Sequence, residues 1–309
     1  MLRYTIRRLL LLIPTMFFVA VIVFFLAHAA PGSPFDAKSN GDKNLPLATI
    51  ERLERLYGVD RPVEEQFVLY LSNVARFDFG NSFRSGRQVS DIIGDGFPVS
   101  AQLGIQALLI ALAFALPLGV VSALKQNSLV DYGSLFFATI GTTIPSFVIA
   151  IVFIYLFGVT FHLLPFVGWS TPAHWVLPTI ILALGPMAFL TRITRAAMLE
   201  AIRQDYVRTA RAKGLREQAV IVTHVMKNAM IPIATIVGPA TAGLITGSII
   251  IEGIFSIPGI GRQFLQSILA RDYPMIMGVY LLYAFLICLA NLSVDLVYGM
   301  LDPRIKVSK

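Results

Sequence analysis

The chain has 309 residues, of which 56% are hydrophobic and only 14% are charged, and its mean hydropathy is +0.73. Soluble domains carry about 25% charged residues, so this composition excludes a soluble protein and indicates a membrane protein. The net charge of +7 does not predict nucleic acid as a partner, because in a membrane protein the position of the basic residues matters more than their sum. The one cysteine, Cys288, excludes an internal disulfide and a cysteine-based metal cluster.

Gaps between charged residues locate the predicted membrane spans. A helix of about 20 apolar residues crosses the hydrocarbon layer. The stretch Tyr132–Thr191 contains 60 residues without Asp, Glu, Lys or Arg, so it is too long for one helix. It divides at Phe161–Trp175, whose prolines, glycine and tryptophans indicate an interfacial loop. The sequence therefore predicts six transmembrane helices, at 9–30, 99–124, 132–158, 176–194, 230–252 and 274–297.

The first span has a competing interpretation as a cleaved signal peptide. Ala27-His28-Ala29 resembles a small-x-small cleavage site. The uncharged run Leu9–Ala27, however, has 19 residues, whereas the apolar region of a signal peptide has about 7–15. We therefore expect a membrane anchor.

The basic residues predict the orientation of the chain. With a cytoplasmic N-terminus, the inner segments 1–8, 125–131, 195–229 and 298–309, together with Arg192 at the end of the fourth span, carry a net charge of +10. The large outer segment, 31–98, carries −2, and the other outer loops are 159–175 and 253–273. Since basic residues accumulate on the cytoplasmic side, both termini are predicted to be inside.

The outer segment 31–98 shows helical periodicity. Ile50, Leu53 and Leu56 fall on one helical face, and Gly58 is a plausible C-terminal stop. Pro62 is placed to start a second helix. A small helical cap is expected here, and the alternative is a loop merely packed on the ends of the spans.

The long inner loop 195–229 contains a helix, a glycine turn and a second helix. Asp205 is placed to cap a helix over Tyr206–Lys213, and Gly214 is placed to end it. The second helix is expected from about Arg216, with Val220, His224 and Asn228 spaced by four on one face. We call residues 205–226 the elbow.

The first helix of the elbow is slim and basic. Ala210 and Ala212 keep it narrow enough for another backbone to approach, and its basic residues are Arg208, Arg211, Lys213 and Arg216. It is suited to rest on anionic lipid headgroups or to dock into a groove of a cytoplasmic partner. Nucleic acid is disfavoured, because both ends of the elbow are tethered to spans.

Motifs of catalysis are absent from the sequence. It has no G-x-x-x-x-G-K-[S/T] loop, no H-E-x-x-H and no G-x-S-x-G, and its four histidines lie in different segments. We therefore expect no catalytic residue, no metal site and no cofactor of its own. Any energy from ATP has to enter through another protein.

The elbow carries a resemblance to a known family. The stretch Asp205–Leu215, followed by His224, Asn228, Ile231 and Pro232, is similar to the coupling loop of bacterial ATP-binding-cassette (ABC) importer membrane subunits of the peptide and nickel permease group. Within that group the chain most resembles the B-type membrane subunits of oligopeptide or dipeptide permeases. Arg208 stands where the general importer motif E-A-A-x-x-x-G has its glutamate, as in members of the peptide group. Matching segments outside the elbow are Ala30–Pro34, Asp78–Gly80, Leu124–Asn127, Ile257–Gly261, Arg271–Tyr273 and Asp302–Ile305.

This resemblance implies a type I ABC importer membrane subunit in the bacterial inner membrane. It implies a second, homologous but different permease subunit, two cytoplasmic ATPase subunits that bind ATP, and an extracytoplasmic binding protein that delivers the peptide. The residues that would receive an ATPase are Asp205, Arg208, Thr209, Ala210, Arg211, Ala212, Lys213, Gly214 and Leu215. The alternatives are an independent channel, a secondary carrier, an exporter component, or an importer of dipeptides, nickel chelates or glutathione.

The fifth predicted span offers candidates for the translocation path. Its small residues, including Gly243-x-x-x-Gly247, favour close helix packing and also leave room for a passing peptide backbone. Thr241, Thr246 and Ser248 carry hydroxyls suited to hydrogen-bond cargo. Glu252 is the last residue of the span. Two interpretations of its side chain remain open: a residue of an outer gate, or a charge at a helix end that water reaches.

Overall fold

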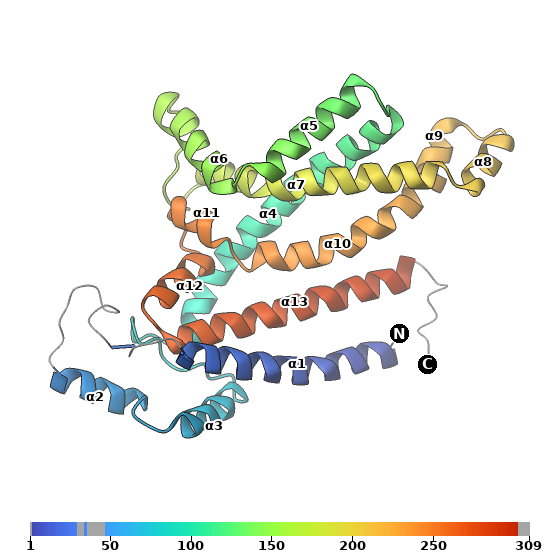
Figure 1. The fold of residues 1–309 in the computed structure, drawn as a ribbon. Helices are drawn as coiled ribbons and strands as arrows, with labels where there is room; N and C mark the ends of the chain where they lie inside the picture. Colours follow the sequence, from blue (N-terminus) through green and yellow to red (C-terminus); the bar gives the residue numbers. More distant parts are fainter. Residues whose placement is uncertain (1, 30–33, 36–46, 302–309) are drawn as a thin grey trace.

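The computed structural model describes residues 2–29, 34–35 and 47–301, and this part of the chain is built from helices (Figure 1). The apolar runs of the sequence form the long helices, because in a bilayer the backbone must satisfy its own hydrogen bonds. The α-helices are α1 (Leu2–Ala29), α2 (Leu47–Tyr57), α3 (Val63–Val74), α4 (Val89–Leu124), α5 (Leu129–Thr143), α6 (Ser146–Phe153), α7 (Pro172–Ile202), α8 (Asp205–Ala212), α9 (Glu217–Ala219), α10 (Lys227–Ile245), α11 (Ile249–Ile254), α12 (Ile260–Leu269) and α13 (Tyr273–Leu301). Two π-helical stretches, η1 (Ile154–Thr160) and η2 (Val220–Met226), continue α6 and precede α10.

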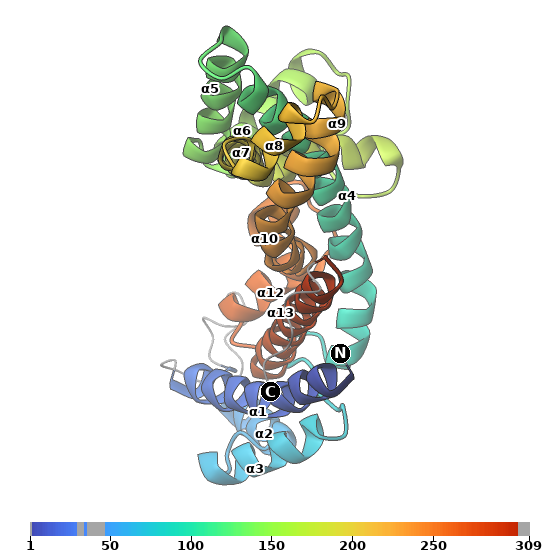
Figure 2. The same cartoon turned by 90° about the vertical axis from the view of Figure 1, so that its right-hand side faces the viewer.

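The long helices form a row rather than a round bundle. Viewed from the end that carries α8 and α9, the row runs from α1 through α13 and α10 to α7 and α5, and α4 runs along one side of it (Figure 2). Along the direction of the long helices, the molecule has two ends. One end holds α8, α9, the start of α1 and the end of α13, and the opposite end holds α2, α3, α11 and α12 (Figure 1). We call these the elbow end and the cap end.

Five helices in the described residues are long and apolar enough to cross a membrane, and the count is six if one bent pair forms a single span. That pair corresponds to the predicted third span, 132–158, where the expectation of one continuous helix is wrong. The axis turns by 100° between α5 and α6. Ile144 is extended, with φ −81° and ψ 123°, because a residue before proline avoids the helical region, and Pro145 then starts α6.

The cap consists of α2 and α3, in agreement with the helices expected on either side of Gly58. Gly58 follows α2 with φ +69°, and Pro62 is the N-cap of α3. Aromatic rings attach the cap to the spans, since Phe24 of α1 lies 5.1 Å from Phe67 and 5.6 Å from Tyr70 between ring centroids.

The most extensive contact between two helices in the described residues joins α4 to α7. A Cβ added at Gly119 of α4 would lie 2.5 Å from the Cβ of Thr194 and 2.8 Å from the carbonyl oxygen of Thr191, both on α7. Only glycine permits this approach, so α4 and α7 form one tightly packed unit. This unit supports the elbow at the elbow end of the molecule.

Candidate docking site

The first helix of the elbow, α8, ends in a complete C-terminal cap. Gly214 has φ +76°, and its N–H donates to the carbonyl of Arg211 at 2.9 Å. The N–H of Leu215 donates to the carbonyl of Ala210 at 3.4 Å. These two bonds define a Schellman motif, which favours glycine because its left-handed residue has no Cβ to clash. The expected stop at Gly214 is confirmed.

The start of α8 differs from the expectation by one residue. Gln204 is the N-cap and its side chain makes no capping hydrogen bond, and Asp205 is the first helical residue. Its carboxylate lies 3.6 Å from the Arg208 guanidinium, and both side chains are exposed. Asp205 therefore acts through its charge near the positive end of the helix rather than as a cap.

The second helix of the elbow has a different register from the one expected. It begins at Glu217 and becomes π-helical over Val220–Met226. The buried residues are consequently Val220, Val225 and Ala229, spaced by five and four, instead of Val220, His224 and Asn228. The wider π-helical turn shifts the buried face by one residue.

The inner face of α8 belongs to the core of the chain itself. Val207 and Ala210 are buried, and Ala210 is 5% exposed. Their cluster also contains Met198 and Ala201 of α7 and Val220 of η2. The expectation that Ala210 keeps α8 narrow for a partner is therefore corrected, because the close neighbours of Ala210 lie in the same chain.

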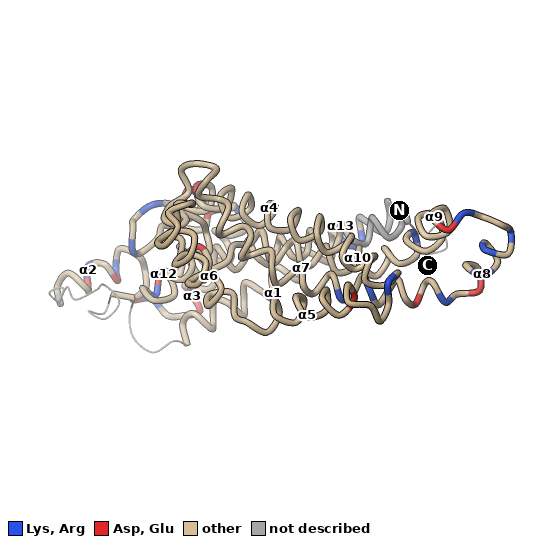
Figure 3. The backbone as a smooth tube through the Cα atoms, turned by 90° about the horizontal axis from the view of Figure 1, so that it is seen from above, with Lys and Arg blue, Asp and Glu red and all other residues tan. Residues whose placement is uncertain are grey.

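The outer face of α8 is open and basic. The exposed residues of α8 and of the turn after it include Asp205, Arg208, Thr209, Ala212, Lys213, Gly214 and Leu215. Several Lys and Arg residues lie along the chain around α8, at this end of the molecule (Figure 3). Arg211 forms two hydrogen bonds to Glu217, at 3.1 and 2.6 Å, which tie α8 to the second helix across the glycine turn. The hydrogen bond and the charge of Glu217 raise the pKa of Arg211 above its ordinary value.

A cavity of about 790 Å³ lies beside the elbow, between the end of α7 and the start of α10. Its polar lining consists of Glu200, Gln204, Tyr206, Lys227 and Asn228. The exposed face of α8 and this cavity together give the elbow end a shaped, polar surface. Among the described residues, no group of three or more His, Cys, Asp or Glu side chains is placed to hold a metal ion.

The hydroxyls expected along the translocation path bond to the chain itself. Thr241 Oγ1 donates to the carbonyl of Val237 at 2.6 Å, and Thr246 Oγ1 donates to that of Gly243 at 3.0 Å. Ser248 caps α11 by accepting from the N–H of Ile251. Thr241 and Ser248 are half-buried, and Thr246 is buried.

Glu252 is neither solvated nor open to a path in this structure. Its side chain is 0% exposed, so the interpretation of a helix end reached by water is wrong. Oε1 accepts from the Ser100 hydroxyl at 2.7 Å, and Oε2 accepts from the N–H of Arg262 at 3.0 Å. The carboxylate therefore caps the N-terminus of α12, where backbone N–H groups otherwise lack acceptors.

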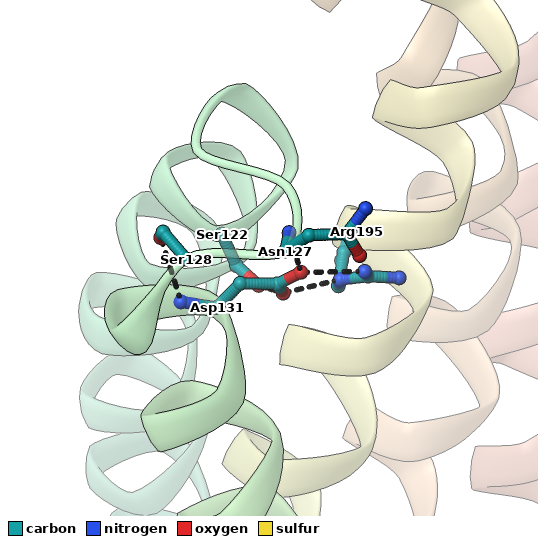
Figure 4. Close-up of polar contacts among 5 residues, drawn as sticks. All are labelled: Ser122, Asn127, Ser128, Asp131 and Arg195. Atoms are coloured by element: carbon teal, nitrogen blue, oxygen red, sulfur yellow. Dashed lines mark hydrogen bonds and ion pairs between the residues drawn. The ribbon is translucent and has the colours of Figure 1, made fainter.

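The sequence does not predict the second buried carboxylate, because Asp131 and Arg195 both fall within the charged inner segments 125–131 and 195–229. Asp131 of α5 is 1% exposed and accepts from Arg195 of α7 through Nε at 2.6 Å and Nη2 at 2.7 Å (Figure 4). The Ser122 hydroxyl and the N–H of Asn127 also donate to this carboxylate. The available signal was Ser128-x-x-Asp131, a helix-start pattern that places Asp131 in the first turn of a span.

The architecture matches solved transporters. A chain of the inward-facing methionine ABC transporter MetNI aligns with a TM-score of 0.53 at 16% identity, covering 68% of this chain and 96% of that one. A chain of an amino acid ABC transporter aligns with a TM-score of 0.51 at 17% identity, covering 70% and 95%. The fold is therefore that of an ABC importer membrane subunit, with six predicted spans and an elbow between the fourth and fifth.

Sequence comparison gives the family. The model described as "Binding-protein-dependent transport system inner membrane component" matches residues 115–307, and the corresponding N-terminal model matches residues 1–104. The chain belongs to this family of inner membrane transport components.

Full-length relatives have been described in several bacteria. The chain is 42% identical to the dipeptide transport system permease protein DppB of Bacillus subtilis, over 100% of this chain and 99% of the relative. It is 40% identical to the oligopeptide transport system permease protein OppB of Salmonella typhimurium, over 99% and 100%. It is 38% identical to DppB of Lactococcus lactis, over 99% and 100%.

Proposed function

We propose that this chain is the membrane-spanning permease subunit of an ATP-driven importer that takes up oligopeptides delivered by a binding protein. The observation that carries the proposal is full-length similarity, at 40–42% identity, to permeases named for dipeptide and oligopeptide transport. The exposed basic face of α8 supports it, because a subunit without its own phosphate-binding loop needs a surface on which ATPases can act.

The proposed assembly contains a second, homologous permease subunit. A row of helices cannot enclose a path by itself, and broad apolar faces remain uncovered. The exposed fractions of Phe136 and Phe137 on α5 are 63% and 72%. In the proposal, two ATPase subunits sit at the elbow end, one of them on α8, and a peptide-binding protein docks at the cap end. This chain binds no ATP, metal or other cofactor itself.

The proposed orientation places both termini and the elbow in the cytoplasm. Cysteine labelling in a Cys288→Ala background tests it. Ser85→Cys, an exposed position beyond the cap, should react with an impermeant reagent from outside the cell, and Gln218→Cys on the elbow should not. The reverse pattern would contradict this topology.

Two of the four path candidates retain that proposed role. Thr241 and Ser248 are partly exposed, whereas Thr246 and Glu252 are buried inside the chain. Cysteines at positions 241 and 248 should therefore be labelled from water in the assembled transporter and be protected by saturating peptide. Labelling that is unaffected by peptide would remove both residues from the path.

Reconstitution tests the function itself. The complete complex in lipid vesicles, with its binding protein, should accumulate a labelled oligopeptide only when ATP is supplied on the ATPase side. Uptake driven by this chain alone would indicate the alternative of an independent channel or secondary carrier. A complex that accumulates only dipeptides, a nickel chelate or glutathione would move the cargo assignment to that alternative.

A further inference from the structure

The ion pair between Asp131 and Arg195 lies between the elbow and the broken span. Arg195 is seven residues before Ile202, the end of α7, and α8 follows at Asp205. Met198, one turn beyond Arg195, is fully buried in the cluster that holds Val207 and Ala210 of α8. The same stretch of α7 thus contacts the elbow on one side of Arg195 and α5 through Arg195 itself.

The attachment of the inner end of α5 depends on few other side chains. Within α5, whose residues are all described, only Asp131 and Ala138 are buried in the chain. A largely apolar cavity of about 650 Å³ is lined by parts of α5, α6 and α7, and α5 packs closely on Ala188 of α7 only farther along, at Gly141. Leu129, beside the ion pair, is 90% exposed. The inner end of α5 is therefore held mainly by a polar contact and not by apolar packing.

Both oxygens of the Asp131 carboxylate are hydrogen-bonded. Four hydrogen bonds converge on the Asp131 carboxylate, from Ser122 Oγ, the Asn127 N–H, and Nε and Nη2 of Arg195 (Figure 4). Two parallel bonds from a planar guanidinium fix orientation as well as distance. Ser122 belongs to α4, which is packed against α7 at Gly119, so the pair joins α5 to an already rigid unit.

We propose that the Asp131–Arg195 pair transmits movement of the elbow to the broken third span, so that α5 follows the elbow during transport. This inference rests on the proposed function, in which ATPases move the elbow. Asp131 and Arg195 are positioning residues in this scheme, because they contact neither the cargo nor the ATPase. The bend at Pro145 then determines how a displacement of α5 reaches α6.

The pair is tested in the complete complex in vesicles with Asp131→Asn, and with the double variant Asp131→Asn/Arg195→Met, which leaves no unpaired charge in the core. Arg192→Met is the matched control, because Arg192 is an exposed cation one turn earlier on α7. Both pair variants should keep the ATPase subunits and hydrolyse ATP. Peptide uptake per ATP hydrolysed should fall by about tenfold, within the usual range of coupling between sites. The control should match the unmodified complex.

A distance measurement gives a readout that does not depend on uptake. Spin labels at Leu129→Cys and Gln218→Cys, in a Cys288→Ala background, report the separation of α5 and the elbow. In the chain with an intact pair, this distance should stay the same when a non-hydrolysable ATP analogue is added, and in the double variant it should change or broaden.

Two results would overturn the proposal: labels that move apart in the chain with an intact pair, or a double variant with normal uptake per ATP. The pair would then serve folding only. Because the first result needs no variant of the pair, poor assembly of the variants does not block the test. Absence of uptake by the unmodified complex would instead contradict the proposed function.

Discussion

The hydroxyl of Ser100 on α4 donates a hydrogen bond of 2.7 Å to the carboxylate of Glu252 on α11, and both side chains are fully buried. The same oxygen of Ser100 accepts from the N–H of Ile260 at 2.8 Å, at the start of α12. One serine and one carboxylate therefore join three helices at the cap end. Buried polar groups are stable in this arrangement because every donor has an acceptor.

Removal of the Glu252 carboxylate should destabilise the cap end. Glu252→Ala leaves the hydroxyl of Ser100 and the N–H of Arg262 without this acceptor, and each unpaired buried donor costs about 1–3 kcal/mol. We expect a loss of about 3 kcal/mol for Glu252→Ala and about 1 kcal/mol for Glu252→Gln, which keeps one carbonyl oxygen. Thermal unfolding of the purified complex measures whether stability falls in the order unmodified chain, Glu252→Gln, Glu252→Ala. Equal midpoints for Gln, Ala and the unmodified chain would contradict the capping role.

Gly259 should be intolerant of a methyl group for a reason specific to this carboxylate. A Cβ there would lie 2.4 Å from Oε2 of Glu252 and 2.5 Å from Oγ of Ser100. We expect Gly259→Ala to lower the unfolding midpoint, because the added methyl group would push Glu252 and Ser100 apart. Gly253→Ala on α11 is the control, because nothing lies within 4 Å of its Cβ position, and it should leave the midpoint unchanged or raised. If both variants behave alike, the tight packing at Gly259 is not a determinant of stability.

Gly214 should be required for coupling but not for membrane insertion. At φ +76° a β-branched residue is strained although its Cβ would meet open space, so Gly214→Val should cost about 1–2 kcal/mol locally. The spans lie outside this turn and should insert normally, while ATPase co-purification and peptide uptake are lost. Gly214→Asn, which tolerates the left-handed region, should retain much of both. Normal uptake by the valine variant would reduce the elbow to a loop resting on lipid headgroups.

Tryptophan at positions 210 and 212 should have different effects. Ala210 is buried among residues of α7 and η2, so Ala210→Trp overpacks the elbow, a change that typically costs about 1–3 kcal/mol, and should make it protease-sensitive in the isolated subunit. Ala212 is exposed, so Ala212→Trp should leave the subunit intact and weaken only its attachment to the ATPases. Limited proteolysis and co-purification separate the two effects. Equal protease resistance in both variants would contradict the internal role of Ala210.

The sequence alone determined the features that depend on local chemistry. Long uncharged runs require a bilayer, and residue periodicity with Pro62 and Gly58 placed the two cap helices. Gly214 after a short basic helix indicated the turn of the elbow, because its backbone conformation is set by the residue itself. These features need no knowledge of what lies on the other side of a helix.

The tertiary structure alone decided which charges are buried and which prolines break a span. Pro117 and Pro186 lie within continuous helices, whereas Pro145 follows a 100° turn, so proline alone does not predict a break. Asp131 and Glu252 look like solvated span ends in the sequence, and each is buried because donors from neighbouring helices and turns surround it. The partners of Glu252 are 152 and 10 residues away along the chain, and that of Asp131 on α7 is 64 residues away. A carboxylate in an apolar region is stable only when such donors converge, and convergence is a property of helix packing that residue order does not display.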